Sequence, residues 1–304
     1  MKKILLICLV FFMVLPCMAS HIVGGEMSYQ YVGPGLSPNT SSYTITLKLF
    51  RDQNCTNCAA MPDIVWIGIY NNDNNSEIIN PENDKNGQIP KNDESQVQVN
   101  PFPPCISNPP SLKYDVATYT FTVTLPNNTT GYTAAYQTCC RVHPIENIFN
   151  NSGTGGGTGS TYSCSIPAIH DSSPQFSTSV DAICRLKHFT LNYSATDADG
   201  DSLVYSFAPA YNSGDLIDSH PVNPAPPSYS SVEYINGYTA EDPLGNKASI
   251  DPQTGIISGI APDIGRYVVC VAVRSYKNGV FVAEHRKDFI VKQKEDYEIY
   301  FKIF

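Results

Sequence analysis

This sequence of 304 residues has little charge and few long apolar stretches. Asp, Glu, Lys and Arg make up 15% of it, whereas typical soluble domains carry about 25%. After the first fifteen residues no apolar run is long enough to span a bilayer about 30 Å thick, so no transmembrane segment is expected. No stretch after the leader shows the apolar stripe of a helix of three turns. These absences argue against a helical protein and leave a strand-rich fold.

Positive charge is especially scarce. Lys and Arg number 19 against 28 Asp and Glu, which gives a net charge of −9. A negative surface repels nucleic-acid phosphates and anionic lipid head groups. The sequence therefore predicts no nucleic-acid partner, and its charge is typical of an extracellular surface.

Motifs of common catalytic sites are also missing. The patterns GxSxG, HExxH and GxxxxGK[ST] do not occur, and the six His are scattered. Residues 22–25, IVGG, resemble the activated amino terminus of trypsin-like proteases, but no GDSGGP loop follows. We therefore expect that this protein is not an enzyme.

The amino terminus has the pattern of a secretory leader. Lys2 and Lys3 precede an apolar run of twelve residues, 4–15, and small residues then favour cleavage before Ser20. Lipidation at Cys17 is the alternative, but Pro16 disfavours it. Residues 1–19 are thus a predicted signal peptide, and the protein is expected to be secreted or on the cell surface.

Cysteine usage agrees with export. Eight cysteines in an exported chain indicate a disulfide framework more than metal ligands, although eight allow about 105 pairings. The pair Cys55 and Cys58 has the spacing of a zinc or redox site but lacks the sequence context for either. The cysteines after the leader are Cys55, Cys58, Cys105, Cys139, Cys140, Cys164, Cys184 and Cys270.

One disulfide is predicted within this set. Cys184 and Cys270 are the two cysteines after residue 165, so pairing them leaves an even number on each side. Cys270 lies out of phase with Tyr267, Val269 and Val271 and should therefore point away from them. The predicted bridge is Cys184–Cys270, and the pairing of the other six stays open.

Short alternating segments fill both halves of the chain. Residues 43–49 and 118–125 alternate apolar side chains with Thr or Lys, which is typical of half-buried strands, and 64–70 is apolar enough for a central strand. Polar residues around 167–175 mark a join. We therefore predict an all-β fold of two consecutive antiparallel β-sandwich domains, residues 20–168 and 169–292, followed by a tail at 293–304.

The second half carries the most specific pattern. SATDADGDSLVYSF at 194–207 joins an Asp-rich turn to a strand, and SIDPQTGIISGIAPDIGRYVVCVAV at 249–273 contains two more turns and two strands. These segments resemble the cadherin-like, immunoglobulin-like repeats of bacterial surface proteins. The resemblance implies an immunoglobulin/cadherin-like β-sandwich for residues 169–292.

The resemblance extends over nearly the whole chain. HIVGGEMSYQYVG at 21–33, YTITLKLFRDQNC at 43–55, YQTCCRVHPIENI at 136–148 and TYSCSIP at 161–167 are similar to the amino-terminal region of large surface proteins of gliding Bacteroidetes. Those proteins usually continue into further repeats and a sorting domain for secretion, and are associated by name with gliding motility. The resemblance implies no catalytic residues.

Asp197, Asp199 and Asp201 place three carboxylates at alternate positions around Gly200. Alternating Asp oxygens are a common way to wrap Ca²⁺, which takes six to eight oxygen ligands. The other interpretation is an ordinary turn in which Asp side chains accept from nearby backbone N–H groups. A structural calcium site is thus a hypothesis here, and no other cofactor is expected.

These observations favour a non-catalytic secreted or cell-surface β-protein in adhesion, matrix building or display of other modules. Its partner would be an extracellular glycan or a surface protein. The alternative is a polysaccharide-binding module or an accessory protein of glycoside hydrolases.

Overall fold

The computed structural model describes residues 22–53, 60–98, 113–139, 141–142, 144–149, 158–177, 183–213 and 223–294. The predicted signal peptide lies outside the described residues, as does the predicted tail except for Gln293 and Lys294, which end the last strand. Within these ranges the fold is all-β with several antiparallel sheets, which confirms the predicted class. The helical structure among them is one 3₁₀ turn, η1 (Lys85–Gly87).

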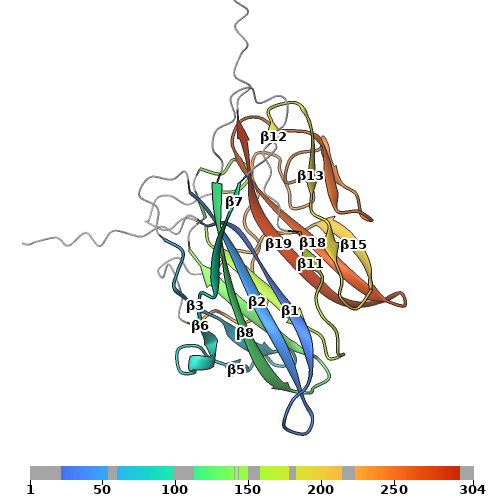
Figure 1. The fold of residues 1–304 in the computed structure, drawn as a ribbon. Helices are drawn as coiled ribbons and strands as arrows, with labels where there is room; N and C mark the ends of the chain where they lie inside the picture. Colours follow the sequence, from blue (N-terminus) through green and yellow to red (C-terminus); the bar gives the residue numbers. More distant parts are fainter. Residues whose placement is uncertain are drawn as a thin grey trace, which may run out of the picture.

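One long sheet forms the centre of the molecule (Figure 1). Its strands, in spatial order, are β15 (Ser202–Phe207), β18 (Arg266–Lys277), β19 (Val280–Lys294), β1 (Ile22–Pro34), β2 (Thr40–Asp52), β8 (Lys113–Pro126) and β7 (Asp93–Gln98). The neighbours in this order are antiparallel. The short β12 (Ile183–Cys184) adds in parallel to the end of β19.

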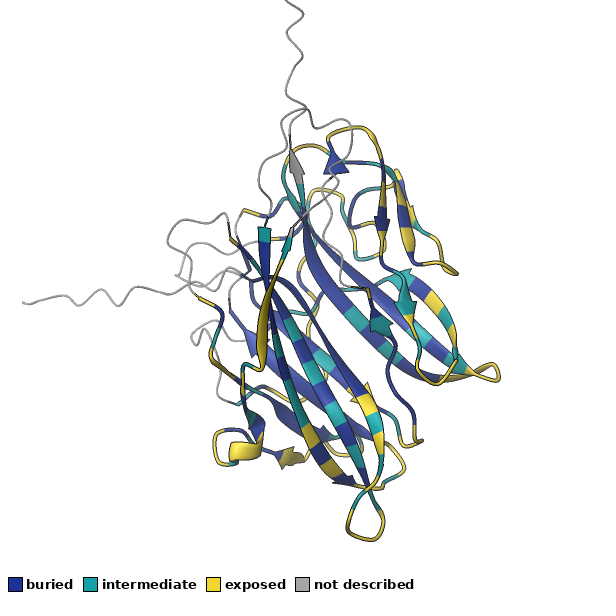
Figure 2. Cartoon of the chain, in the orientation of Figure 1, coloured by how far each residue is buried: buried dark blue, intermediate teal, exposed yellow. Residues whose placement is uncertain are grey.

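The predicted alternation fixes which face of β2 and β8 is buried. In β2, Ile45, Leu47 and Leu49 are fully buried, and the residues between them are half-buried. Figure 2 shows the same alternation as bands along the long strands. Because successive side chains of a strand point to opposite faces, each strand gives one row to the core and one row of hydroxyls to the surface.

A second layer covers the buried face of β1, β2 and β8. It consists of β10 (Ser160–Ile166), β9 (Tyr132–Thr138), β4 (Gly68–Asn71) and β5 (Glu77–Ile79), in this spatial order. A two-stranded pair, β3 (Ile64–Trp66) and β6 (Gln88–Pro90), lies beside it. Side chains from both layers form one apolar core, as expected for packed sheets.

The predicted single strand over 64–70 is wrong in one respect. Val65, Ile67 and Ile69 are fully buried, as predicted, but the chain changes partners at Ile67. β3 pairs with β6, Ile67 N–H donates to Gly87 O at 2.8 Å, and β4 then pairs with β9. An apolar run cannot reveal such a change, because the side chains on both sides of it are equally buried.

The other end of the sheet has two cores, one on each face of β18. Tyr267, Val269, Val271 and Val273 pack against β13 (His188–Asn192), β17 (Ile256–Ile260) and β16 (Ala248–Ile250). Val268, Cys270 and Ala272 belong to a different core, with Val142, Ile145 and Ile148. The predicted out-of-phase position of Cys270 is confirmed. A further pair, β11 (Gln175–Phe176) and β14 (Ala195–Thr196), completes this half.

The two predicted domains share the central sheet. β1, from the predicted domain 20–168, pairs with β19, from the predicted domain 169–292, with Gly24 opposite Phe289. The predicted join itself runs beside β1, because Tyr29 N–H donates to Ser173 Oγ and Ser173 N–H donates to Tyr29 O, both at 2.9 Å. The sequence pattern of each half gave no sign of this continuity.

Candidate functional site

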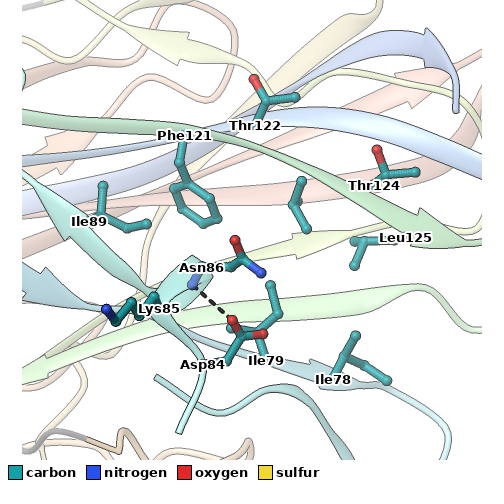
Figure 3. A pocket seen from close by; sticks show the side chains of 11 residues that line it. Ile78, Ile79, Asp84, Lys85, Asn86, Ile89, Phe121, Thr122, Thr124 and Leu125 are labelled. Carbon is teal, nitrogen blue, oxygen red and sulfur yellow. Dashed lines mark hydrogen bonds between the residues drawn. The ribbon is translucent and has the colours of Figure 1, made fainter. Parts of the chain in front are cut away.

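A groove opens where β8 runs past the end of β7. Its volume is about 540 Å³. One wall is the stretch of β8 from Phe121 to Leu125, and the opposite wall comes from β5, η1 and β6. We call it the edge groove, and Figure 3 shows the side chains around it. The lining residues are Ile78, Ile79, Asp84, Lys85, Asn86, Ile89, Phe121, Thr122, Val123, Thr124 and Leu125.

The floor of the edge groove is apolar. Ile79, Ile89 and Leu125 are buried and belong to the core beneath it, and Phe121 packs against that core while staying partly exposed. Ile78 lies at the lip and is 39% exposed. Such a floor binds apolar side chains or ring faces.

Polar groups surround this floor. The carboxylate of Asp84 accepts a hydrogen bond from Asn86 N–H at 2.9 Å, which holds the first turn of η1 in place. Lys85 is exposed beside it, so the rim carries one charge of each sign. In Figure 3, Thr122 and Thr124 lie on the far side of the β8 ribbon from the apolar side chains.

The hydroxyls of β8 pair with those of β2. Thr122 Oγ1 forms a hydrogen bond with Thr44 Oγ1 at 3.2 Å, and Thr124 Oγ1 with Ser42 Oγ at 2.9 Å. These cross-strand pairs stabilise the sheet and fix the Thr side chains on its outer face.

Sequence reasoning found one wall of this groove and missed the other. The alternation over 118–125 predicted β8, but residues 71–94 have the Asn- and Pro-rich composition of a loop. Two short apolar pairs in that stretch, Ile78-Ile79 and Ile89 with Pro90, were the available signal. Segments of three residues are too short for a periodicity to be read.

The three predicted calcium ligands lie in a turn, where Asp197 Oδ1 accepts from Asp199 N–H at 2.9 Å and from Asp201 N–H at 3.0 Å. Gly200 has φ +79° at the tip, where L side chains are strained. The turn interpretation is therefore confirmed for Asp197. Among the described residues no three His, Cys, Asp or Glu side chains are grouped so that they could hold a metal ion. Calcium binding thus stays a prediction that requires these side chains to reorient.

A fourth carboxylate, which the sequence did not indicate, lies next to this turn. Asp171 is fully buried, neither of its oxygens accepts a hydrogen bond from a described residue, and Lys277 Nζ is 3.5 Å from Oδ1. Burial, and then the charges of Asp201 and Asp199, raise its pKa to about 6, while Lys277 opposes the shift. Ser172 N–H donates to Asp199 Oδ2 at 2.8 Å and ties the two segments together. The cluster carries more negative charge than Lys277 balances.

The predicted disulfide Cys184–Cys270 is wrong. Cys184 is disulfide-bonded, but Cys270 is a free, buried thiol, so the partner of Cys184 is another cysteine. Cys184 lies opposite Lys294 of β19, whereas Cys270 lies opposite Asp288. Six residues of strand separate these positions by about 20 Å. A disulfide needs Cα atoms within about 7 Å.

The expected disulfide framework is only partly present. Cys139 is disulfide-bonded, but Cys164 is a free thiol, and burial raises its pKa to about 12. Cys164 and Cys270 are therefore small apolar core residues rather than reactive groups. Cys55, Cys58, Cys105 and Cys140 lie outside the described residues.

A second, smaller hollow of about 380 Å³ lies under the loop that joins β1 and β2. Ser41 Oγ donates to Asn127 Oδ1 at 2.7 Å and lies 3.1 Å from His170 Nε2. Because Ser41 Oγ donates its proton to Asn127 Oδ1, that proton is not directed at His170. His170 also stacks on Tyr31 at 4.6 Å between ring centroids. This Ser–His contact is therefore not arranged as a nucleophile and its base.

None of the helical structure in the described ranges is long and apolar enough to cross a membrane. Comparison with models of protein families and with curated proteins gives no match for this chain. A function for the protein therefore rests on its own residues, among which the edge groove is a hollow large enough to hold a ligand.

Proposed function

We propose that this protein is a non-catalytic, exported or cell-surface β-protein that acts by binding, in adhesion, matrix building or display of other modules. The observation that carries the proposal is the edge groove, an apolar-floored hollow of about 540 Å³ beside an exposed strand. Concave apolar sites with a few polar groups at the rim are the usual shape of binding sites.

The lining of the groove supports binding rather than chemistry. Its carboxylate, Asp84, is engaged with the backbone of η1, and the other polar side chains are Lys85, Asn86 and two Thr. A paired general acid and base would need two titratable groups within reach of one substrate. The likeness of residues 169–292 to immunoglobulin/cadherin-like repeats, and of the chain to surface proteins of gliding bacteria, belongs to the same proposal.

A polysaccharide ligand is the second candidate, and one observation favours it. The outer face of β2 and β8 carries a ladder of Ser and Thr hydroxyls, in which Thr46 and Thr120 also pair at 3.1 Å. The regularly spaced hydroxyls of this face offer a row of hydrogen-bonding groups to a sugar.

The proposal is tested by measuring how strongly beads coated with the mature chain attach to surfaces coated with protein or with polysaccharide. A glycan array tests sugar binding, and a reducing-sugar assay tests for turnover. We expect attachment without turnover, and Ile78→Asp at the groove lip should reduce it about tenfold. Ile256→Asp is the matched control, since Ile256 is similarly exposed, at 37%, but lies on β17. Release of reducing sugars, or attachment that is equal in both variants, would contradict the proposal.

A further inference from the structure

We propose that the edge groove binds a short extended peptide segment of another protein, which adds to β8 as an extra strand. This inference rests on the proposed function and specifies the ligand of the same site. Strand addition draws its affinity from main-chain hydrogen bonds and its specificity from pockets for alternate side chains.

The main-chain groups of β8 show where a strand would add. Thr118 O accepts from Asn92 N–H at 2.9 Å, and Thr120 N–H donates to the Asn92 side chain, so both groups face the β7 side. In an antiparallel sheet the N–H and C=O groups of alternate residues point to the same side. The N–H and C=O groups of Thr122 and Thr124 therefore face that side as well.

Those four groups have no partner in the described part of the chain. The pairing of β7 with β8 ends at Asp93 opposite Thr118, and β2 occupies the other side of β8 as far as Pro126. No described hydrogen bond reaches Thr122 or Thr124 from the β7 side. An exposed edge of this kind is a template for pairing with another chain.

The lining of the groove shows that it opens onto this edge. Five consecutive residues, Phe121 to Leu125, line it. Successive side chains point to opposite faces of a strand, so a hollow against one face would be lined by alternate residues only. In Figure 3 the β8 ribbon runs across the picture, with Thr122 and Thr124 on one side of it and Phe121 and Leu125 on the other.

The groove also sets the character and length of the peptide. A strand added about 4.8 Å from β8 would direct alternate side chains toward Ile79, Ile89 and Leu125, and those between them toward solvent. Asn92 closes one end, and Pro126, which has no N–H, ends the edge at the other. The segment is thus about three to five residues long, with apolar side chains at alternate positions. The opposite charges of Asp84 and Lys85 favour no net charge on it.

A peptide fits these groups better than a sugar does. The unpaired donors and acceptors repeat at the spacing of a strand, which is the spacing of another main chain. The hydroxyls that a sugar would use, those of Thr122 and Thr124, already pair with Thr44 and Ser42.

The test uses the mature chain and a phage library of random seven-residue peptides. Peptides are selected on the wild-type chain after removal of those that bind the variant Thr124→Pro. Proline at 124 removes an outward N–H that β2 does not use, and edge strands tolerate proline at such positions. The consensus peptide is then synthesised and titrated against the wild-type chain, Thr124→Pro, and the double variant Thr122→Val with Thr124→Val.

We expect a consensus with apolar residues at every second position. Thr124→Pro should weaken its binding about tenfold through the lost N–H hydrogen bond, while the double Val variant, which keeps the main chain, should bind within about twofold. N-methylation of alternate peptide residues should weaken binding equally, and this measurement needs only the wild-type chain. No enrichment, or binding lost with the hydroxyls and retained with proline, would overturn the inference.

The two proposals fail differently. If no peptide is enriched while bead attachment still depends on Ile78, the strand-addition inference fails and the proposed function stands. If attachment does not depend on the groove lip either, the proposed function fails as well.

Discussion

At the scale of residues, several buried carboxylate oxygens without hydrogen bonds from the described residues gather around the Asp197–Asp201 turn. Buried oxygens of Asp171, Asp197 and Asp201 accept no hydrogen bond from the described residues. Lys277, whose side chain is 46% exposed, is the cation that faces Asp171. Burying a carboxylate without enough compensation destabilises its charged form, and this imbalance gives two measurable consequences.

The first consequence is that Asp171 makes the stability of the folded protein depend on pH. The pKa of Asp171 is raised to about 6 in the folded protein from its ordinary value of 3.8. The folded state therefore binds this proton more tightly than the unfolded state, and the contribution of Asp171 to stability falls as pH rises from about 4 through 6. Asp171→Asn should raise the melting temperature at pH 7.5 by about 2–4 °C, as roughly 1 kcal/mol does in a chain of this size. The difference from wild type should vanish near pH 4. A constant difference across this range would contradict the assignment.

The second consequence concerns calcium. Four carboxylates against one ammonium group leave unpaired oxygens that a divalent cation would satisfy once the side chains reorient. Millimolar CaCl₂ should raise the melting temperature of the mature chain, because a ligand of the folded state stabilises it by mass action. Asp199→Ala should abolish the rise, and Asp263→Ala, at an exposed carboxylate of another loop, should not. If calcium does not shift the melting temperature, the calcium site is rejected and only the turn interpretation remains.

At the scale of elements, the contact between β1 and β19 depends on small residues. A Cβ atom on Gly24 would lie 2.5 Å from Asp288 O and 2.9 Å from Phe289 Cα. Beside this contact, Arg141 Nη1 donates to Asp288 Oδ1 at 2.8 Å in a fully buried pair. Close main-chain approach and a buried ion pair thus fix the same register.

Gly24→Ala should therefore destabilise the protein strongly, by about 2–4 kcal/mol, because the neighbouring main chain has to move. Ser28→Ala on the same strand is the control and should change stability by less than about 1 kcal/mol. Urea unfolding of both variants measures the difference. Equal stability of the two would contradict the tight contact of β1 with β19.

The strands with long period-two patterns could be predicted from sequence, and the contacts between them could not. Alternation over 43–49 gave the buried face of β2 correctly, because the side chains of one face are apolar and those of the other are mostly polar. In β18 the row Tyr267, Val269, Val271 and Val273 is buried as expected, but the other face is buried in a second core as well. The pairing of β1 with β19 joins residues more than 260 positions apart, and a local pattern carries no information on such a partner. The predicted Cys184–Cys270 pairing failed for the same reason. Counting cysteines gives no information on how far apart the two residues lie beside β19.

At the scale of the whole molecule, the central sheet makes the two predicted domains dependent on each other. β19 lies between β18 and β1, so a fragment of residues 169–292 alone would lose its β1 neighbour and expose that edge of β19. It would also lose Arg141, the partner of the buried Asp288. An unpaired buried charge costs about 3–5 kcal/mol.

Fragments 20–168 and 169–292 should therefore not fold separately. We expect the mature chain to unfold in one cooperative transition, followed both by calorimetry and by far-ultraviolet circular dichroism. Each fragment alone should show no transition, and mixing them should restore part of it. Two independent transitions, at the temperatures of the separate fragments, would contradict this interdependence.

The binding role assigned to the edge groove requires that the β8 edge is open in the free protein. Amide hydrogen exchange along β8, measured by NMR on the mature chain without ligand, tests this most directly. The N–H groups of Phe121 and Val123 face β2 and should exchange slowly, whereas those of Thr122 and Thr124 face the groove and should exchange at least about a hundredfold faster. Slow exchange at all four residues would show that the edge is already paired, and would contradict the account.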